Sequence, residues 1–295
     1  MIHHLNGLSI TEKLYESMQP SENDLRFAAI ESNLAEYTSN YAAWHWHEYV
    51  EFAYVLNGAV DCCTPSRKLT LHAGEGYFVN ANVLHMNRIA AGSSTALFRI
   101  LQFDASLLAC AGIIARNYIA PIENAAGLEC FAFSGGHSCD ILVSMQAAFQ
   151  AAAAEKDGYE IEIVQLLYKL WRELYLLVKS ELYDVSPVTD NLANRIKTML
   201  TFIHTHYADG INVANIAASA NISQREAYRS FRQVLGTTPA LYLQQYRIST
   251  ASRLLTETTE SITDIALACG FSSPNYFSMA FREQTGKSPR DFRGR

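Results

Sequence analysis

Four polar side chains near the C-terminus are of types that read DNA. Arg225, Tyr228, Arg229 and Arg232 recur so that a helix would carry them on one side. Arginine can form two hydrogen bonds with guanine O6 and N7, and tyrosine can touch base edges or phosphate. The opposite side of that helix would be apolar, with residues repeating every four positions at Ala227, Phe231 and Leu235. This amphipathic pattern predicts a helix with a DNA-reading face.

A second set of candidate DNA-binding residues lies further along the chain. It comprises Pro274, Asn275, Ser278, Met279 and Arg282. Asn275 can address adenine and Arg282 suits phosphate, whereas Pro274 and Met279 offer only apolar contact. A single surface arginine is usually just solvated, but two outward-facing sets in equivalent positions favour DNA binding.

The elements that must position these residues form an internal repeat. The first copy runs from Ile216 to Pro239 and the second from Ile265 to Pro289, an offset of 49 residues at the start and 50 at the end. In each copy a short helix ends at a residue that tolerates the left-handed conformation, and a second helix stops at glycine. The spacing predicts two helix-turn-helix units.

Serines at the start of each second helix are expected to cap it. Ser223 fills this position in the first unit, with Glu226 completing a capping box, and Ser272 or Ser273 fills it in the second. Residues 239–256 have helical apolar spacing and would form one connecting helix. Two recognition helices about 34 Å apart can enter successive major grooves.

The charge balance differs between the two parts of the chain. The net charge is −6 over 295 residues, but residues 1–190 carry 11 Lys and Arg against 22 Asp and Glu, and residues 191–295 carry 12 against 7. Only the C-terminal part has the net positive charge that phosphate binding requires.

Residues 42–103 have the pattern of short strands, which predicts an antiparallel β-sandwich or barrel. Asn57-Gly58 lies between two apolar runs and predicts a hairpin turn. Helical periodicity follows over 141–155 and 161–181, and the second segment has a wide apolar stripe. That stripe could pack on the chain's own barrel or form a dimer, and the sequence does not decide between them.

Residues 184–190 are polar, contain Pro187 and lie where the charge balance changes sign. We therefore expect domains at 1–184 and 194–295, joined by a linker at 185–193. The six cysteines have no CxxC spacing, and no signal peptide or membrane span is apparent, so we expect free thiols and a cytoplasmic protein.

The segment from Asn194 to Arg295 resembles the DNA-binding domain of the AraC/XylS family. The resemblance is carried by the run from Gly270 to Arg282 and by Gly286 and Ser288-Pro289 after it. The family commonly has a basic residue where this chain has Met279, so the second unit should make fewer base contacts. The resemblance implies a homodimer on promoter DNA, with RNA polymerase as a further candidate partner.

Residues 41–102 resemble the cupin barrel that precedes the DNA-binding domain in many members of this family. His45, His47, Glu51 and Gly58 have the spacing of the first cupin motif, and His85 ends the second. Asn80 and Asn82 replace the proline and glycine of the second motif.

In catalytic cupins the residues at the positions of His45, His47, Glu51 and His85 hold one divalent metal. Imidazoles with one carboxylate suit iron, manganese, nickel or zinc. Regulators of the family instead bind an organic effector, usually a sugar, in the barrel mouth, and a structural network of these groups is the third alternative. We expect these four residues and Trp46 to bind the effector, with no metal or other cofactor.

Together these features predict an α+β protein with an N-terminal cupin-like antiparallel β-barrel, following helices, and a C-terminal all-α domain of two helix-turn-helix units joined by a linker helix. We expect a non-enzymatic transcription activator controlled by a small-molecule effector, with a carbohydrate as the expected class. The alternatives are a metal-dependent cupin enzyme with a DNA-binding tail and a regulator that binds DNA constitutively.

Overall fold

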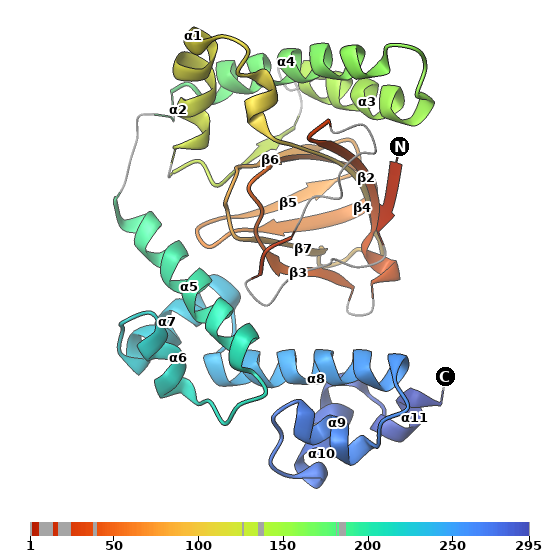
Figure 1. Cartoon of the computed structure of the whole chain (residues 1–295), viewed down its shortest axis with the longest axis vertical. Coiled ribbons are helices and arrows are strands. Elements are labelled where there is room, and N and C mark those ends of the chain that lie inside the picture. Colours follow the sequence, from red (N-terminus) through yellow and green to blue (C-terminus); the bar gives the residue numbers. More distant parts are fainter. Residues whose placement is uncertain are drawn as a thin grey trace. The chain divides into compact units, whose positions relative to one another are not determined.

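The computed structural model describes residues 2–5, 14–16, 25–37, 40–125, 127–134, 139–180, 182 and 187–294. The chain divides into two compact units, Met1–Ala193 and Asn194–Arg295. The first contains the strands and the second is helical (Figure 1). Within the described residues, no helix is both long enough and apolar enough to cross a membrane.

Nine strands form the core of the first unit and hydrogen-bond into one network. They are β1 (Ile2–Leu5), β2 (Phe27–Asn33), β3 (Tyr41–His45), β4 (Val50–Cys63), β5 (Lys68–His72), β6 (Gly76–Val79), β7 (His85–Ile89), β8 (Ala96–Phe103) and β9 (Cys130–Phe133). The main path runs β1-β2-β8-β4-β6-β9, and a second part joins β3, β7, β4 and β5. β1 and β2 are parallel and the other strand pairs are antiparallel.

The α+β class and the cupin-like strand region are confirmed, with one difference in the strand pairing. Among the described strands, β1 and β9 lie at the edges of the main path and do not pair with each other. The sheet is therefore not closed into a barrel by hydrogen bonds.

The hairpin predicted at Asn57-Gly58 is wrong, because β4 runs straight through both residues. Residues 50–58 of β4 pair with β8, and its continuation over 59–63 pairs with β5. Gly58 has φ +77°, and a Cβ there would lie 2.0 Å from the backbone oxygen of Thr95. The Asn-Gly pair thus marks the point where one strand changes partners.

Two long helices cover the strands of the first unit (Figure 1). The apolar stripe predicted on the second of them is buried on the chain's own sheet, where Trp171 lies edge-on to Phe103 at 6.2 Å. The structure therefore accounts for this stripe without a dimer. The helical elements of this part are η1 (Leu34–Glu36), η2 (Ala105–Leu108), α1 (Gly112–Ile114), η3 (Ala115–Ile119), α2 (Ala120–Glu123), α3 (Cys139–Ala154) and α4 (Tyr159–Val178).

The second unit contains the two predicted helix-turn-helix units, α6-α7 and α9-α10, and α8 connects them (Figure 1). α5 begins at Pro187, inside the segment predicted as the linker. The helices of this unit are α5 (Pro187–His206), α6 (Val213–Ser219), α7 (Gln224–Leu235), α8 (Pro239–Glu257), α9 (Ile262–Ala268), α10 (Pro274–Thr285) and α11 (Pro289–Arg293).

The turns within the two helix-turn-helix units depend on left-handed backbone. Asn221 has φ +54° and Gly270 has φ +79°. A Cβ at Gly270 would lie 2.5 Å from the carbonyl oxygen of Tyr207, so only glycine fits there. Phe271 follows, is 3% exposed and packs between α9 and α10, with its ring 5.1 Å from that of Phe277.

Candidate DNA-binding surface and histidine cluster

The first recognition helix, α7, is set by its caps and its apolar side. The Ser223 side chain accepts a hydrogen bond from the Glu226 amide at 3.2 Å, and the helix ends at Gly236 with φ +64°. Ala227 and Phe231 are fully buried. Burying this side turns the predicted DNA-reading side outward.

The structure places the four predicted residues of α7 together on that side. Arg225, Arg229 and Arg232 are exposed and Tyr228 is half-buried. They line one open depression together with Ser223, Glu226 and Gln233. Three guanidinium groups give this surface the charge that a phosphate backbone attracts.

Glu226 is part of this surface, although the sequence suggested only a capping role for it. Its Oε1 accepts a 2.7 Å hydrogen bond from Arg229 Nη2 and lies 3.7 Å from Arg195 Nη1 on α5. A carboxylate three residues before an arginine on a helix is the signal that could have indicated this pairing. Glu226 therefore holds the guanidinium of Arg229 in place.

The second recognition helix, α10, is built in the same way. Ser273, one of the two predicted caps, accepts a hydrogen bond from the Tyr276 amide at 3.4 Å. The buried side of α10 consists of Phe277, Ala280 and Phe281. Asn275, Met279 and Arg282 are exposed, and Pro274 and Ser278 are half-buried. Tyr276, which was not predicted, is 48% exposed on the same helix.

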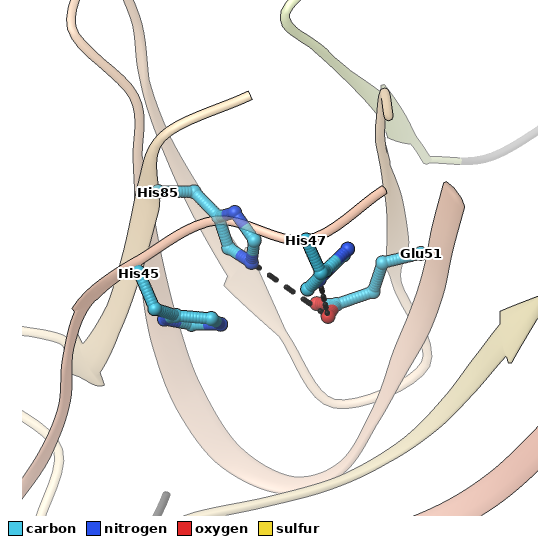
Figure 2. A group of neighbouring side chains, drawn as sticks. All are labelled: His45, His47, Glu51 and His85. Atoms are coloured by element: carbon cyan, nitrogen blue, oxygen red, sulfur yellow. Dashed lines mark ion pairs between the residues drawn. The ribbon is translucent and has the colours of Figure 1, made fainter. Parts of the chain in front are cut away.

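The predicted cluster in the first unit is assembled from β3, β4, β7 and the segment between β3 and β4. His45, His47, Glu51 and His85 each offer one ligand atom, and these atoms lie within 4.8 Å of one another (Figure 2). The Nε2 atoms of His47 and His85 lie 3.5 and 3.7 Å from Glu51 Oε2. All four residues are buried.

The three imidazoles are oriented by backbone carbonyls. The Nδ1 atoms of His45, His47 and His85 lie 2.8, 2.9 and 2.9 Å from the carbonyl oxygens of residues 43, 49 and 83. A carbonyl oxygen only accepts hydrogen bonds, so each Nδ1 carries the proton. In the neutral ring each Nε2 then presents a lone pair to the centre of the cluster, as in metal-binding histidines.

Charges within the cluster shift its pKa values in opposite directions. Burial alone would raise the pKa of Glu51, but the neighbouring His47 and His85 outweigh burial and hold that pKa well below its ordinary value. Burial also lowers the pKa of His47, but Glu51 outweighs it and the net pKa is raised. Burial and the charges of the other two histidines lower the pKa of His45. An ionised Glu51 therefore needs a positive partner here.

The cluster fits a divalent cation. Glu51 Oε1 and His85 Nε2 are buried and have no hydrogen-bond partner among the described residues, and Tyr77 Oη and Asn87 Oδ1 are in the same condition. Ligands bound to one ion at about 2.1 Å lie about 3.0–4.2 Å apart, depending on the coordination number. The separations of 3.5 and 3.7 Å between the histidine Nε2 atoms and Glu51 Oε2 fall in this range. His45, His47, His85 and Glu51 would hold such an ion, which could polarise a bound oxygen.

The cavity beside the cluster is small. Its volume is about 10 Å³, the space of roughly one water molecule. It is lined by Glu16, Ile30, Ser32, Tyr37, Ala42, His45, Glu51, Asn87, Phe98, Ile100 and Gln102. Glu16 and Gln102 belong to no motif that the sequence indicated.

Of the predicted effector-binding residues, His45 and Glu51 line this cavity, whereas Trp46, His47 and His85 do not. Trp46 lies between two inward-facing histidines, and adjacent side chains of an extended chain point to opposite sides. Its ring packs edge-on against Tyr15 at 5.0 Å, and Trp44 is 6% exposed.

The second cupin motif keeps its geometry despite its two replacements. Asn82 has φ +62°, a conformation that asparagine adopts more readily than most residues and glycine adopts freely. Asn80 donates a hydrogen bond to the carbonyl oxygen of Ile122 at 2.7 Å. The chain can therefore bring His85 into the cluster with asparagine at both positions.

Comparisons with known proteins match both units. A model described as a helix-turn-helix domain matches residues 216–295, and a cupin domain model matches residues 38–100. The chain is 26% identical over 291 residues to the uncharacterized HTH-type transcriptional regulator YdeC of Bacillus subtilis, covering 98% of this chain and 99% of that protein.

The second unit has a more similar relative. The HTH-type transcriptional activator RhaS of Escherichia coli is 39% identical over 120 residues, which is 41% of this chain and 42% of RhaS. Among solved structures, the DNA-binding domain of AdpA in complex with a target DNA is 33% identical, with a TM-score of 0.32, and the match covers 35% of this chain and 90% of that one.

Proposed function

We propose that this chain, which matches a helix-turn-helix model and a cupin model, is a transcription regulator of the AraC type. In this proposal it reads promoter DNA through α7 and α10 under control of an effector bound at the histidine cluster. The observation that carries this proposal is the exposed arginine side of α7, held outward by a buried apolar side. We propose that it acts in the cytoplasm, as a homodimer and as an activator. The name of RhaS supports activation, and RNA polymerase is then the expected further partner.

The two helices are proposed to contribute unequally. On α7, arginine donors and a tyrosine hydroxyl can meet base edges and phosphates. On α10, Asn275 and Arg282 are the polar groups among the predicted residues that stand exposed, and Met279 offers an apolar surface. We therefore expect the first unit to set sequence preference and the second to add affinity.

The effector is proposed to bind at the cluster of His45, His47, Glu51 and His85. A carbohydrate is the class implied by the family resemblance, but pockets for organic ligands usually measure roughly 300 Å³ or more. A cavity of about 10 Å³ would have to widen around a sugar. A panel of sugars should therefore be tested for a shift in DNA affinity, alongside divalent metal ions.

A cupin enzyme with a DNA-binding tail is the second candidate function, and the cation-ready cluster is the observation in its favour. The small cavity counts against it, because a substrate has little room beside the ion. Loading the purified protein with Zn²⁺ or Mn²⁺ and finding no effect on DNA binding, together with turnover of a small substrate, would favour the enzyme.

The experiment that tests the regulator is DNA selection followed by mutation. Duplexes enriched from a random library by the full-length protein should bind more tightly than random duplexes. Arg229→Ala should weaken binding to the enriched duplex by about 1–3 kcal/mol, roughly tenfold to a hundredfold, and relax its sequence preference.

Arg172→Ala is the matched control for this substitution. Arg172 lies on α4 in the other unit, has a side chain 70% exposed against 72% for Arg229, and likewise pairs with a glutamate. It should leave DNA binding unchanged. If no sequence is enriched, or if Arg229→Ala binds as the wild type does, the regulator proposal fails.

A further inference from the structure

We propose that Glu16 is a fifth protein donor to a divalent metal ion held by the histidine cluster. Glu16 lies 29 residues before His45 in the sequence, outside both cupin motifs. The inference goes beyond the proposed function and does not depend on DNA binding. It rests on the position of Glu16, on the pairing of the imidazoles and on the balance of buried charge.

The position of Glu16 is fixed by backbone hydrogen bonds to the histidine-containing segment. The Glu16 amide donates to the Trp46 carbonyl at 3.0 Å, and the Trp46 amide donates to the Leu14 carbonyl at 2.8 Å. Tyr15 and Trp46 form a parallel bridge. Because Trp46 stands between the two histidines of β3 and its continuation, this pairing sets Glu16 beside them.

The Glu16 side chain faces His45 at the edge of the cluster, outside the set of four ligand atoms that lie within 4.8 Å of one another. Glu16 is 7% exposed, and its Oε2 lies 3.5 Å from His45 Nε2 and 3.5 Å from Gln102 Nε2. Gln102 Nε2 also donates to Glu51 Oε2 at 3.2 Å. One amide group therefore links the two carboxylates on the inner wall of the cavity.

The two carboxylates divide the three imidazoles between them. Glu51 lies against His47 and His85, whereas the His45 Nε2 faces Glu16. All three Nδ1 atoms donate to carbonyls, so with the imidazoles neutral each pair would bring together a nitrogen lone pair and a carboxylate oxygen. A cation between the imidazole nitrogens and the carboxylate oxygens could be bound by both kinds of atom.

With a divalent ion bound, the charges would balance if Glu16 as well as Glu51 were ionised. Three neutral imidazoles and two ionised carboxylates compensate a divalent ion, so the loaded site is neutral and its burial costs less than that of a net charge. Nitrogen and carboxylate donors in this number suit zinc, manganese, iron or nickel. A metal ion would thus fasten the segment of residues 14–16 to the strand that carries His45.

The test is metal affinity of the full-length protein after removal of metal with a chelator. Zn²⁺ and Mn²⁺ are titrated in competition with a chromophoric chelator, for wild type, Glu16→Gln and Glu48→Gln. Glu48 is the control because it follows His47 directly but is exposed. We expect Glu16→Gln to weaken binding roughly tenfold to a hundredfold or more, and Glu48→Gln to bind as the wild type does.

Amide hydrogen exchange gives a second readout that a purely structural glutamate would not change. Metal should slow exchange at the amides of Glu16 and Trp46 in the wild type, and not in Glu16→Gln. If Glu16→Gln does not fold, the wild-type exchange alone decides, and exchange that metal leaves unchanged overturns the proposal.

Two further outcomes would also overturn the proposal. One is a wild type that binds neither metal, and the other is a Glu16→Gln variant that binds both metals as tightly as the wild type. Binding of the enriched duplex is measured in parallel for every variant. Its persistence would show that the regulator function stands even where the metal proposal fails.

Discussion

At the scale of residues, the proposal that α7 sets sequence preference centres on Arg229 and its partner Glu226. The carboxylate holds the guanidinium through a 2.7 Å hydrogen bond, on a surface that otherwise carries positive charge. An anchored guanidinium loses less freedom when it meets a guanine, and a nearby carboxylate repels phosphates that approach at random. We therefore expect the pair to favour discrimination between sequences at some cost in affinity.

Glu226→Gln should therefore raise affinity for random DNA while reducing discrimination. We expect binding to a random duplex to tighten a few-fold and the ratio of enriched to random affinity to fall by a similar factor, measured by fluorescence anisotropy at fixed salt. Glu173→Gln, which alters an arginine-paired glutamate on α4, is the control and should change neither affinity. An unchanged ratio in Glu226→Gln would contradict the role assigned to this carboxylate.

His204 makes the stability of the second unit depend on pH. It lies on α5 with its Nε2 3.0 Å from the Tyr242 hydroxyl and its ring 3.8 Å from that of Tyr246. Burial lowers the pKa of His204 to about 3. The unfolded chain takes up a proton near pH 6.5, but the folded chain stays neutral until about pH 3, so the free energy of unfolding falls as the pH falls through this window.

At pH 5 this effect should cost about 2 kcal/mol relative to pH 7. Glutamine at position 204 does not titrate, so the stability difference between wild type and His204→Gln should shrink by that amount between pH 7 and pH 5. Urea unfolding of both full-length proteins at the two pH values measures it. Stability profiles that stay parallel would show that His204 does not titrate as described.

At the scale of elements, the turn between α9 and α10 places a recognition helix. Gly270 and Gly286 both have positive φ, +79° and +74°, but only Gly270 is crowded. A Cβ at Gly270 would meet the carbonyl oxygens of Tyr207 and Ala208 at 2.5 and 2.9 Å, whereas a Cβ at Gly286 would meet nothing within 4 Å. A substitution at Gly286 therefore measures the cost of the left-handed backbone alone, and one at Gly270 measures that cost together with a steric clash.

Gly286→Ala should destabilise the protein by about 1 kcal/mol, the cost of left-handed backbone in a residue with a side chain. Gly270→Ala should cost more, on the order of 3 kcal/mol, because the backbone after α5 must move as well. Chemical unfolding of the two variants gives both values. Equal losses of stability in the two variants would mean that the loop before α6 moves away from the new Cβ at no cost in free energy.

How far the sequence predicts an element depends on whether its signals are local. The helix-turn-helix units carry their caps, turn residues and apolar sides within about 25 residues each, and Ser223 and Gly236 lie where the pattern indicates. The Asn57-Gly58 turn signal fails because strands distant in sequence pair with β4 on both sides of it, and the residues form an irregularity within a continuous strand. Strand periodicity predicted only a sandwich or barrel, and the resemblance to cupin domains narrowed this to a cupin-like fold.

The same reasoning explains which parts of the cluster could be predicted. His45, His47, Glu51 and His85 follow a spacing motif, and the structure brings them together. Glu16 and Gln102 reach the site through strand pairing and a backbone bridge, which leave no trace in residue spacing. Trp46 sits inside the motif, but it packs against Tyr15 and does not line the cavity.

At the scale of the whole molecule, charge is divided between the two units. Residues 1–190 contain 22 acidic and 11 basic side chains, and this negative balance opposes the approach of DNA. Residues 191–295 contain 12 basic and 7 acidic side chains, and this positive balance favours it. DNA attraction must then come from a small number of exposed cations in the second unit, among them Arg282. The bounds of the linker at 185–193 stay a prediction.

Binding should therefore weaken steeply as salt rises, in proportion to the phosphates contacted. Arg282→Ala should weaken binding about equally for all sequences and reduce the slope of log affinity against log salt by about 1 for each bound protomer. Titrations at four salt concentrations, with Arg172→Ala as the control, give the slopes. A slope that Arg282→Ala leaves unaltered would remove this residue from the phosphate contacts.

The continuity of β4 also bears on how the first unit forms during synthesis. This strand, which carries Glu51, pairs with β5, β6, β7 and β8, all of which follow it in the chain. As the chain leaves the ribosome, β4 must wait for residues up to Phe103 before its partners are complete. Such non-local pairing is slow, so nascent β4 has unpaired edges that chaperones or aggregation can capture.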